Sequence, residues 1–253
     1  MVMMDDSDLT ICVCTYNSAG TLEGCLSSVR RSAPEGRLLV VDHGSTDSTR
    51  EIAKRYDALL IIEHKGLGYA RQLCFDSTNT EYLAFVDSDV EIRDNRFFKT
   101  GAKILTDQKR GAIVGMAEGH RFAYGLPAGL LLLRKRDFKG RVIPEYIDAR
   151  ETYFIEKRLS QLGLRVVYLA DAMIHRSQFR KFKPEWEGAN TRLACGLSLR
   201  QLLFAFRVVV LIALNSRSIK NLAYTPIFYL KFLRGFVEPS RWRRLRREGR
   251  EDA

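Results

Sequence analysis

The sequence lacks the cysteine spacing that a disulfide framework or a zinc ribbon requires. Its five cysteines are odd in number, and no two of them form a C-x-x-C pair. The amino-terminal stretch MVMMDDSDLT is acidic and has no apolar core of the kind that a secretory signal carries. We therefore expect reduced thiols and a cytoplasmic location.

The carboxyl-terminal part also lacks an apolar run long enough to cross a membrane. The run 202–214 has 13 residues and contains Arg207. As a helix it would be about 20 Å long, whereas a bilayer core is about 30 Å thick. We therefore expect this run to lie against a surface and not to span a membrane.

Net charge is absent from the first part of the chain and concentrated in the rest. Residues 1–175 carry 24 Lys and Arg against 24 Asp and Glu, whereas residues 176–253 carry 17 against 6. The second part therefore supplies the whole net charge of +11. This division predicts a neutral globular body with a basic appendage, whose partner could be anionic lipid or nucleic acid.

In the first half, short apolar runs alternate with segments of helical spacing. The apolar runs cover 9–14, 37–42, 58–64 and 81–87, and the helical segments cover 21–32, 46–56 and 67–77. Such alternation predicts an α/β fold with a mainly parallel, Rossmann-like sheet and helices on both faces. Ligands of such sheets bind beyond the carboxyl ends of the strands.

A polar cluster follows each of the four predicted strands, namely TYNSAGT, DHGSTDST, HKGLGYAR and DSDVE. Each cluster also has a purely structural explanation that needs no ligand. In the second cluster, for example, Gly44 could make a turn while Ser45 or Asp47 caps the next helix. KGLGYAR also lacks the G-x-G-x-x-G spacing of a dinucleotide site. Four clusters at one edge of a sheet nevertheless favour a single site. The charged side chains suited to a nucleotide diphosphate bridged by a metal are Asp42, Arg71, Asp87 and Asp89.

The stretch LAFVDSDVEI places carboxylates at alternate positions, Asp87, Asp89 and Glu91. If the stretch is a strand, these side chains point to one face. Converging carboxylates repel unless a cation lies between them, so the stretch fits either a divalent cation site or a solvated acidic turn. Glu91 is then a further ligand, a group behind the ligands, or a solvated side chain.

In order along the chain, ICVCTYNSAGTLEGCLSSV, LLVVDHGSTDSTREIAKRY and GLGYARQLCFDSTNTEYLAFVDSDVEI resemble the amino half of family 2 glycosyltransferases of GT-A fold. The resemblance is strong over 9–92 and looser over 93–176. It implies that the nucleotide sugar is held by Thr15, Tyr16, Asn17, Asp42, Arg71, Asp87 and Ser88. It also implies that Asp89, assisted by Asp87, binds Mg²⁺ or Mn²⁺. The family usually reads DDGS where this chain has DHGS, so His43 is a departure.

The segment DARETYFIEKRLSQLGLRVVYLADAMIHR resembles the family's ED helix, followed by a Gly turn, a strand and a His. The Asp that is usually the base corresponds to Thr152. Glu151 or Asp148 could replace it, or an anionic acceptor such as a polyprenyl phosphate needs no strong base. His175 matches the family's terminal His, which the resemblance places near the metal or the diphosphate, and we expect it to be a metal ligand beside Asp89 and Asp87.

The tail is predicted to form basic amphipathic helices that lie in a membrane interface. Five aromatic residues lie among Lys231 and Arg234 in NLAYTPIFYLKFLRGFVEP, and RWRRLRREGR follows. The alternative is a helical hairpin that covers the catalytic domain, and we expect no nucleic acid partner. The predicted domains are a GT-A catalytic domain at 1–182 and the basic tail at 183–253.

These features and the resemblance together predict a metal-dependent glycosyltransferase on the cytosolic face of a membrane, and the resemblance implies that it is inverting. Its donor would be a nucleotide sugar and its acceptor a glycan or a lipid of the polyprenyl phosphate type. A nucleotidyltransferase is a rival, although CTYNSAG lacks that class's Gly-rich activating loop. A non-catalytic nucleotide-sugar-binding or scaffold protein is a second rival, because the ED helix lacks its Asp.

Overall fold

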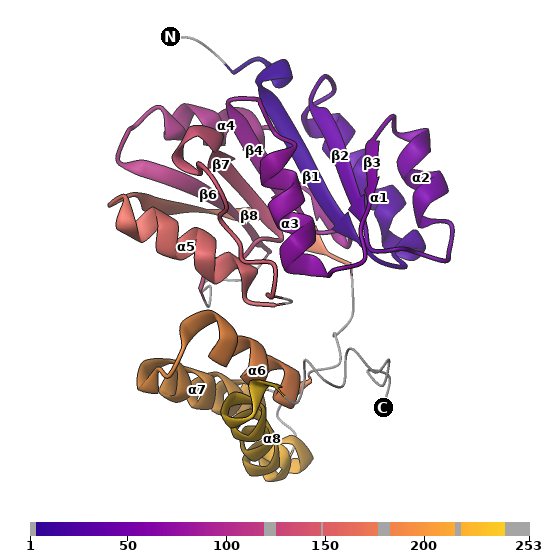
Figure 1. The fold of residues 1–253 in the computed structure, drawn as a ribbon. Coiled ribbons are helices and arrows are strands. Elements are labelled where there is room, and N and C mark those ends of the chain that lie inside the picture. Colours follow the sequence, from indigo (N-terminus) through magenta and orange to yellow (C-terminus); the bar gives the residue numbers. More distant parts are fainter. Residues whose placement is uncertain (1–3, 119–124, 148, 177–182, 216–218, 241–253) are drawn as a thin grey trace. The chain divides into compact units, whose positions relative to one another are not determined.

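The computed structural model describes residues 4–118, 125–147, 149–176, 183–215 and 219–240. The chain divides into two compact units (Figure 1). Unit 1 comprises residues 1–146 and 151–179, and unit 2 comprises residues 147–150 and 180–253. The predicted domain boundary near residue 182 falls outside the described residues and stays a prediction.

Unit 1 is a sheet with helices on both faces. Its strands are β1 (Leu9–Thr15), β2 (Arg37–Asp42), β3 (Leu59–Ile62), β4 (Tyr82–Val86), β5 (Val90–Ile92), β6 (Arg110–Ala117), β7 (Leu130–Arg134) and β8 (Arg165–His175). Its helices are α1 (Ala19–Ser32), α2 (Thr49–Arg55), α3 (Leu67–Asp76), α4 (Phe97–Leu105) and α5 (Glu151–Gln161). The predicted alternation of strands and helices in the first half is confirmed.

The strand order is β3-β2-β1-β4-β7-β6-β8-β5. The first four strands in this order are parallel, as predicted, whereas β7 pairs antiparallel with both β4 and β6, and β5 pairs antiparallel with β8. The sheet is therefore mixed, with its parallel half at the β3 side. The carboxyl ends of β1, β2, β3 and β4 lie along one edge, where the four polar clusters follow them.

The two faces of the sheet are covered by different helices. Alternate side chains of β1, such as Ile11 and Val13, belong to a core that also includes buried residues of α1, α2 and α4. On the opposite face, Phe75 of α3 packs edge-to-face against Phe85 of β4. Both faces of β1, β2 and β4 are therefore dry, which explains why these strands read as continuous apolar runs.

Unit 2 contains three described helices, α6 (Pro184–Cys195), α7 (Leu199–Asn215) and α8 (Ile219–Val237). Helices α6 and α8 pack with their backbones in contact, because a Cβ at Gly188 would overlap the carbonyl of Phe232 and one at Gly235 would overlap that of Glu185. Phe232, Phe236 and Ala205 form a small buried core. None of the described helices is long and apolar enough to span a membrane.

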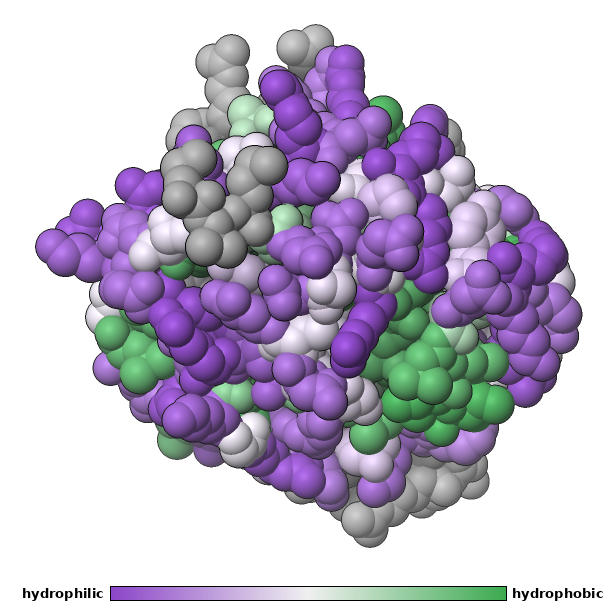
Figure 2. All heavy atoms as spheres, turned by 90° about the horizontal axis from the view of Figure 1, so that it is seen from above, coloured by the Kyte–Doolittle hydropathy of each residue, from purple (hydrophilic) through white to green (hydrophobic). Residues whose placement is uncertain are grey.

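Several large apolar side chains are solvent-exposed in both units. In unit 2 they lie on α7 and α8 and in the turn before α7. In unit 1 the edge strand β3 exposes 62% of Leu59 and 47% of Ile62. Figure 2 shows a largely hydrophilic surface that is interrupted by a compact hydrophobic patch.

Candidate active site

Two carboxylates lie on a tight turn between β4 and β5. Strand β4 ends at Val86, and the backbone N–H of Val90 donates to the carbonyl of Asp87 over 2.9 Å. The backbone N–H of Asp87 donates to the carbonyl of Gly129 over 3.0 Å. Asp87 and Asp89 therefore converge because of a turn. The expectation that strand alternation would align them was wrong, because the strand stops one residue earlier.

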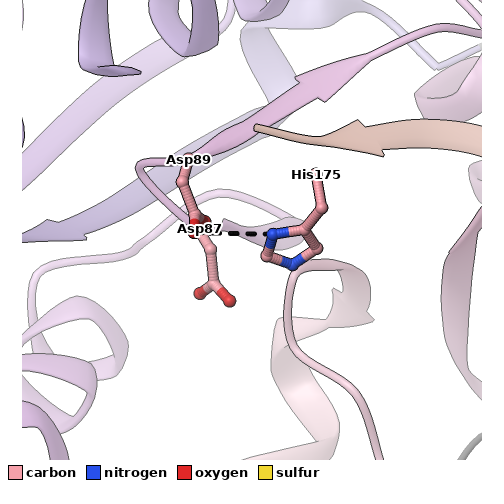
Figure 3. Close-up of side chains that lie close together, drawn as sticks. All are labelled: Asp87, Asp89 and His175. Atoms are coloured by element: carbon pink, nitrogen blue, oxygen red, sulfur yellow. Dashed lines mark ion pairs between the residues drawn. The ribbon is translucent and has the colours of Figure 1, made fainter. Parts of the chain in front are cut away.

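The turn brings Asp87 and Asp89 together with His175, the last residue of β8. One ligand atom from each of the three residues lies within 4.8 Å of the other two. The carboxylates and the imidazole point toward a common region (Figure 3). His175 is delivered there because β8 pairs with β5, so that His175 faces Val90 in register. These are the three residues that the sequence predicted as metal ligands.

The electrostatics of this cluster are those of a negative site. Nδ1 of His175 lies 3.4 Å from Oδ2 of Asp89. This contact with Asp89 raises the pKa of His175 above its ordinary value, against the opposing effect of burial. The carboxylates of Asp87 and Asp89 repel each other. A proton on the imidazole would reduce this repulsion, and so would a divalent cation bound between the three groups. Two carboxylates and an imidazole suit Mn²⁺, and the carboxylates alone suit Mg²⁺.

Glu91 belongs to a different contact. Its carboxylate accepts two hydrogen bonds from the guanidinium of Arg176, over 2.9 and 2.8 Å. These bonds lower the pKa of Glu91 below its ordinary value. Its carboxylate also fills the space beside Gly24 of α1, where a Cβ would collide with it. Among the described residues Glu91 is thus held by Arg176, outside the cluster of possible metal ligands.

Arg71 on α3 is a buried cation with 4% of its surface exposed. Its Nη2 donates to Oδ1 of Asp87 over 2.9 Å, and its Nε lies 3.2 Å from Oε1 of Glu151. The guanidinium also lies over the ring of Phe85, 5.0 Å from its centroid. Burial alone would lower the pKa of Arg71, but attraction by Asp87 and Glu151 outweighs it and holds the pKa above the ordinary value.

Of the two predicted base candidates, the structure describes Glu151 but not Asp148. Glu151 begins α5 and is buried, with its carboxylate paired to Arg71. Asp148 lies outside the described residues. Thr152 follows Glu151 at the position where the family's base is expected, and its hydroxyl is no substitute for a carboxylate. The structure therefore joins Glu151 to the site through Arg71.

The loop after β1 is fastened to the turn after β2. Asn17 has a left-handed backbone, with φ of 47°, and its N–H donates to Oγ of Ser45 over 2.8 Å. Its side-chain oxygen accepts from the N–H of Thr46 over 2.9 Å. Thr15 is buried, whereas the neighbouring Tyr16 is 58% exposed. Of these three predicted nucleotide-binding residues, Tyr16 and Asn17 are exposed, and the side-chain oxygen of Asn17 is already hydrogen-bonded to Thr46.

Asp42 is fully buried, and its carboxylate is used within its own turn. The N–H of Ser45 donates to Oδ2 over 2.8 Å, and the hydroxyl of Ser45 donates to Oδ1 over 2.5 Å. Gly44 makes this turn with φ of 71°. Asp47 accepts from the N–H groups of Thr49 and Ala19, at the starts of two helices. Gly44 and Asp47 therefore have the purely structural roles considered above, Gly44 in the turn and Asp47 in helix capping.

Two contacts at this edge were missed at the sequence level. Ser18 and Ser88 share a hydrogen bond of 3.0 Å between their hydroxyls, which joins the loop after β1 to the turn that carries Asp87 and Asp89. Nδ1 of His43 lies 2.6 Å from Oε1 of Glu63. The second contact could have been anticipated from the pairing of β2 with β3. Asp42 lies opposite Ile62 in this pair, so the residues that follow, His43 and Glu63, are neighbours.

Comparisons of the sequence with known proteins identify a family and relatives for this chain. The sequence model of Glycosyl transferase family 2 matches residues 10–179. A teichoic acid poly(glycerol phosphate) polymerase of Staphylococcus epidermidis is 32% identical over 93 residues, which are 33% of this chain and 13% of that protein. The chain therefore spans only a small part of this relative.

Solved structures share the architecture. The mannosyltransferase PcManGT of Pyrobaculum calidifontis, in complex with GDP-Man and Mn²⁺, has a TM-score of 0.64 at 15% identity, covering 92% of this chain and 86% of that one. Glucosyl-3-phosphoglycerate synthase of Mycobacterium tuberculosis, in complex with Mn²⁺, UDP and glucosyl-3-phosphoglycerate, has a TM-score of 0.59 at 17% identity, covering 75% and 80%. Likeness at these identities shows the fold alone, and the predicted GT-A fold is confirmed.

Proposed function

The chain belongs to glycosyl transferase family 2, and from this premise we propose that it transfers a sugar from a nucleotide diphosphate sugar to an acceptor, with inversion at the anomeric carbon. Two proteins of the same fold were solved with Mn²⁺ and a nucleotide ligand, GDP-Man in one and UDP in the other. The proposal gives this chain the same ligand classes, a nucleotide sugar and Mg²⁺ or Mn²⁺.

The observation that carries the proposal is the cluster of Asp87, Asp89 and His175, whose ligand atoms lie within 4.8 Å of one another. Carboxylate oxygens and an imidazole nitrogen are ligands that a divalent cation binds, so these residues fit such a cation. Asp89 and Asp87 would hold the cation, and His175 would complete the donor set. A cation bound there supplies positive charge for the diphosphate, which makes it a better leaving group.

The other roles follow from position. Arg71 donates a hydrogen bond of 2.9 Å to Asp87, and the proposal gives its permanent positive charge the role of stabilising the diphosphate. Because its guanidinium is buried and paired with two carboxylates, little reorganisation is needed as charge develops. Ser88 and Asp87 are proposed to contact the ribose, and the loop of Thr15, Tyr16 and Asn17 to contact the nucleoside.

Deprotonation of the acceptor has two proposed routes. Either Glu151 or Asp148 accepts the proton from a hydroxyl group, or the acceptor is already anionic and needs no strong base. The pairing of Glu151 with Arg71 limits its freedom to act as a base, because the carboxylate must then leave or share the guanidinium. The route is decided by substituting the two carboxylates separately.

We also propose that unit 2 contacts the cytosolic face of a membrane, where the acceptor would be a glycan or a lipid-linked phosphate. Its helices expose large apolar side chains, and exposed cations lie near them in the sequence, including Arg200, Arg207 and Lys231. The apolar set is Leu197, Leu199, Leu203, Phe206, Ile227, Leu230 and Val237. Shallow burial of such side chains and attraction of cations to anionic lipid act together. The Arg-rich stretch 241–250 lies outside the described residues.

The test is incubation with a panel of sugar nucleotides, Mn²⁺ and a membrane extract. Sugar transfer with release of a nucleoside diphosphate supports the proposal. Release of pyrophosphate would identify the rival nucleotidyltransferase. Donor binding without turnover would identify a non-catalytic nucleotide-sugar-binding protein.

A further inference from the structure

The side chain at the end of β2 that faces solvent is His43. The preceding Asp42 is fully buried, and both of its carboxylate oxygens accept from Ser45. The side chain of His43 is 35% exposed and follows directly. The resemblance placed Asp42 among the residues that hold the nucleotide sugar, but both carboxylate oxygens of Asp42 are used within its own loop. His43 is the polar group that this strand end offers to a ligand.

His43 is held in one orientation by Glu63, which is buried at the end of β3. Oε1 of Glu63 lies 2.6 Å from Nδ1 of His43. Oε2 of Glu63 accepts from the backbone N–H groups of Lys65 and Gly66, over 2.5 and 2.9 Å. Both oxygens of Glu63 are therefore occupied, and its position is fixed by the loop that leads into α3.

This arrangement determines which ring nitrogen carries the proton. A carboxylate only accepts hydrogen bonds, so Nδ1 of His43 must donate to Glu63. In the neutral ring Nε2 is then an acceptor with a lone pair. Within the described part of the chain, Nε2 of His43 has no hydrogen-bond partner. The ring thus offers one acceptor of fixed direction at the edge of the sheet.

Aromatic groups surround this acceptor. Tyr16 packs edge-on against His43 with centroids 5.4 Å apart, and the His64 ring lies 6.4 Å from that of His43. His64 also covers Gly44, where a Cβ would collide with its ring. Exposed aromatic faces of this kind suit a flat heterocycle.

The aromatic group is continuous with the cation site. Tyr16 is two residues before Ser18, and the hydroxyl of Ser18 is hydrogen-bonded to that of Ser88 over 3.0 Å. Ser88 lies between Asp87 and Asp89 on the turn. A base at Tyr16 and His43 and a diphosphate at Asp87 and Asp89 would therefore be joined along one loop.

We propose that the His43–Glu63 pair selects the nucleotide base of the donor, because Nε2 of His43 accepts a hydrogen bond from a ring N–H of the base. Uracil carries such a group at N3 and guanine at N1, whereas the corresponding ring nitrogens of cytosine and adenine are acceptors that would repel Nε2. The inference rests on the proposed function, since it assumes that a nucleotide sugar binds at this edge.

The test measures binding of UDP, GDP, CDP and ADP by calorimetry in the presence of Mn²⁺, at about pH 8. UDP or GDP is expected to bind tightest. Methylating its ring N–H, as N3-methyl-UDP or N1-methyl-GDP, should weaken binding to the wild-type chain by about 5- to 100-fold. The same methylation should weaken binding to His43→Ala by less than about twofold, because that variant lacks the acceptor. Asp107→Ala, at an exposed position outside this group, is the control and should keep the penalty.

A second measurement reads the tautomer without any ligand. Nitrogen NMR of the wild-type ring should show the proton of neutral His43 on Nδ1. Glu63→Gln, whose amide can donate to Nδ1, should move the proton to Nε2 and abolish the methylation penalty while the ring stays in place. A wild-type proton on Nε2, or an equal methylation penalty in His43→Ala, would overturn the inference alone. Absence of binding by all four diphosphates would overturn the proposed function as well.

Discussion

Arg71 donates from Nη2 to Oδ1 of Asp87 over 2.9 Å, from a position where only 4% of the arginine is exposed. The Nε of the same guanidinium lies 3.2 Å from Oε1 of Glu151. A carboxylate of the cation site is thereby connected to the start of α5 through one buried cation. The contact explains how two segments far apart in sequence are held in one site.

Replacing this cation should cost stability as well as activity. Arg71→Met leaves Asp87 and the buried Glu151 without their partner, so we expect a loss of about 3 kcal/mol in the free energy of unfolding, measured by urea titration. Arg55→Met is the control, because the ion pair of Arg55 with Glu23 is more than half exposed on both sides. That substitution should change the free energy by less than about 0.5 kcal/mol. Equal losses in both variants would contradict the role given to Arg71.

The base is tested by comparing Glu151→Gln with Asp148→Asn. The variant that removes the base should lose about 10²- to 10⁴-fold in kcat with little change in donor affinity. Loss of donor affinity in Glu151→Gln would instead identify Glu151 as the partner that positions Arg71. Near-normal rates in both variants would favour an anionic acceptor that needs no base.

The pair of Glu91 and Arg176 predicts a pH dependence of stability. The pKa of Glu91 is lowered in the folded state by its hydrogen bonds to Arg176. The contribution is therefore present above the unfolded pKa of a glutamate, about 4.3, and is lost as the pH falls through the lower folded value. Wild type should exceed Glu91→Gln in stability at neutral pH, and the difference should shrink on acidification below pH 4. A difference that persists unchanged at about pH 2 would contradict this assignment.

Much of the fold was predictable because local pattern and packing agree. The runs at β1, β2 and β4 are buried on both faces, so they read as strands without any knowledge of their partners. The antiparallel pairing of β7 was not predictable in the same way, because LLLLR fits any buried strand and its neighbours are set by chain topology. Short strand β5 was hidden inside an acidic stretch.

The site was predictable at the level of residues and less so at the level of contacts. Asp87, Asp89 and His175 were found by motif and do converge, although through a turn and not through strand alternation. The engagement of Asp42 with Ser45 depends on side-chain rotamers within one loop, which no sequence pattern encodes.

Membrane contact is tested with the full chain and point variants. Replacing Leu199, Leu203 and Leu230, each more than 60% exposed in unit 2, by Glu should reduce co-sedimentation with anionic liposomes several-fold. Leu59→Glu is the control, because Leu59 is 62% exposed in unit 1. Wild-type binding should also weaken at high salt. Unchanged sedimentation of the triple variant would show that these side chains are not the anchor.

The central claim is that Asp89 helps to hold a cation without which sugar transfer does not occur. The most direct measurement is nucleoside diphosphate release from a sugar nucleotide and acceptor with Mn²⁺, comparing wild type, Asp89→Ala and the control Asp107→Ala, whose carboxylate is exposed away from the cluster. We predict that Asp89→Ala falls by at least about 10²-fold and keeps its fold by circular dichroism, while Asp107→Ala turns over like wild type. Wild-type turnover by Asp89→Ala would contradict the account.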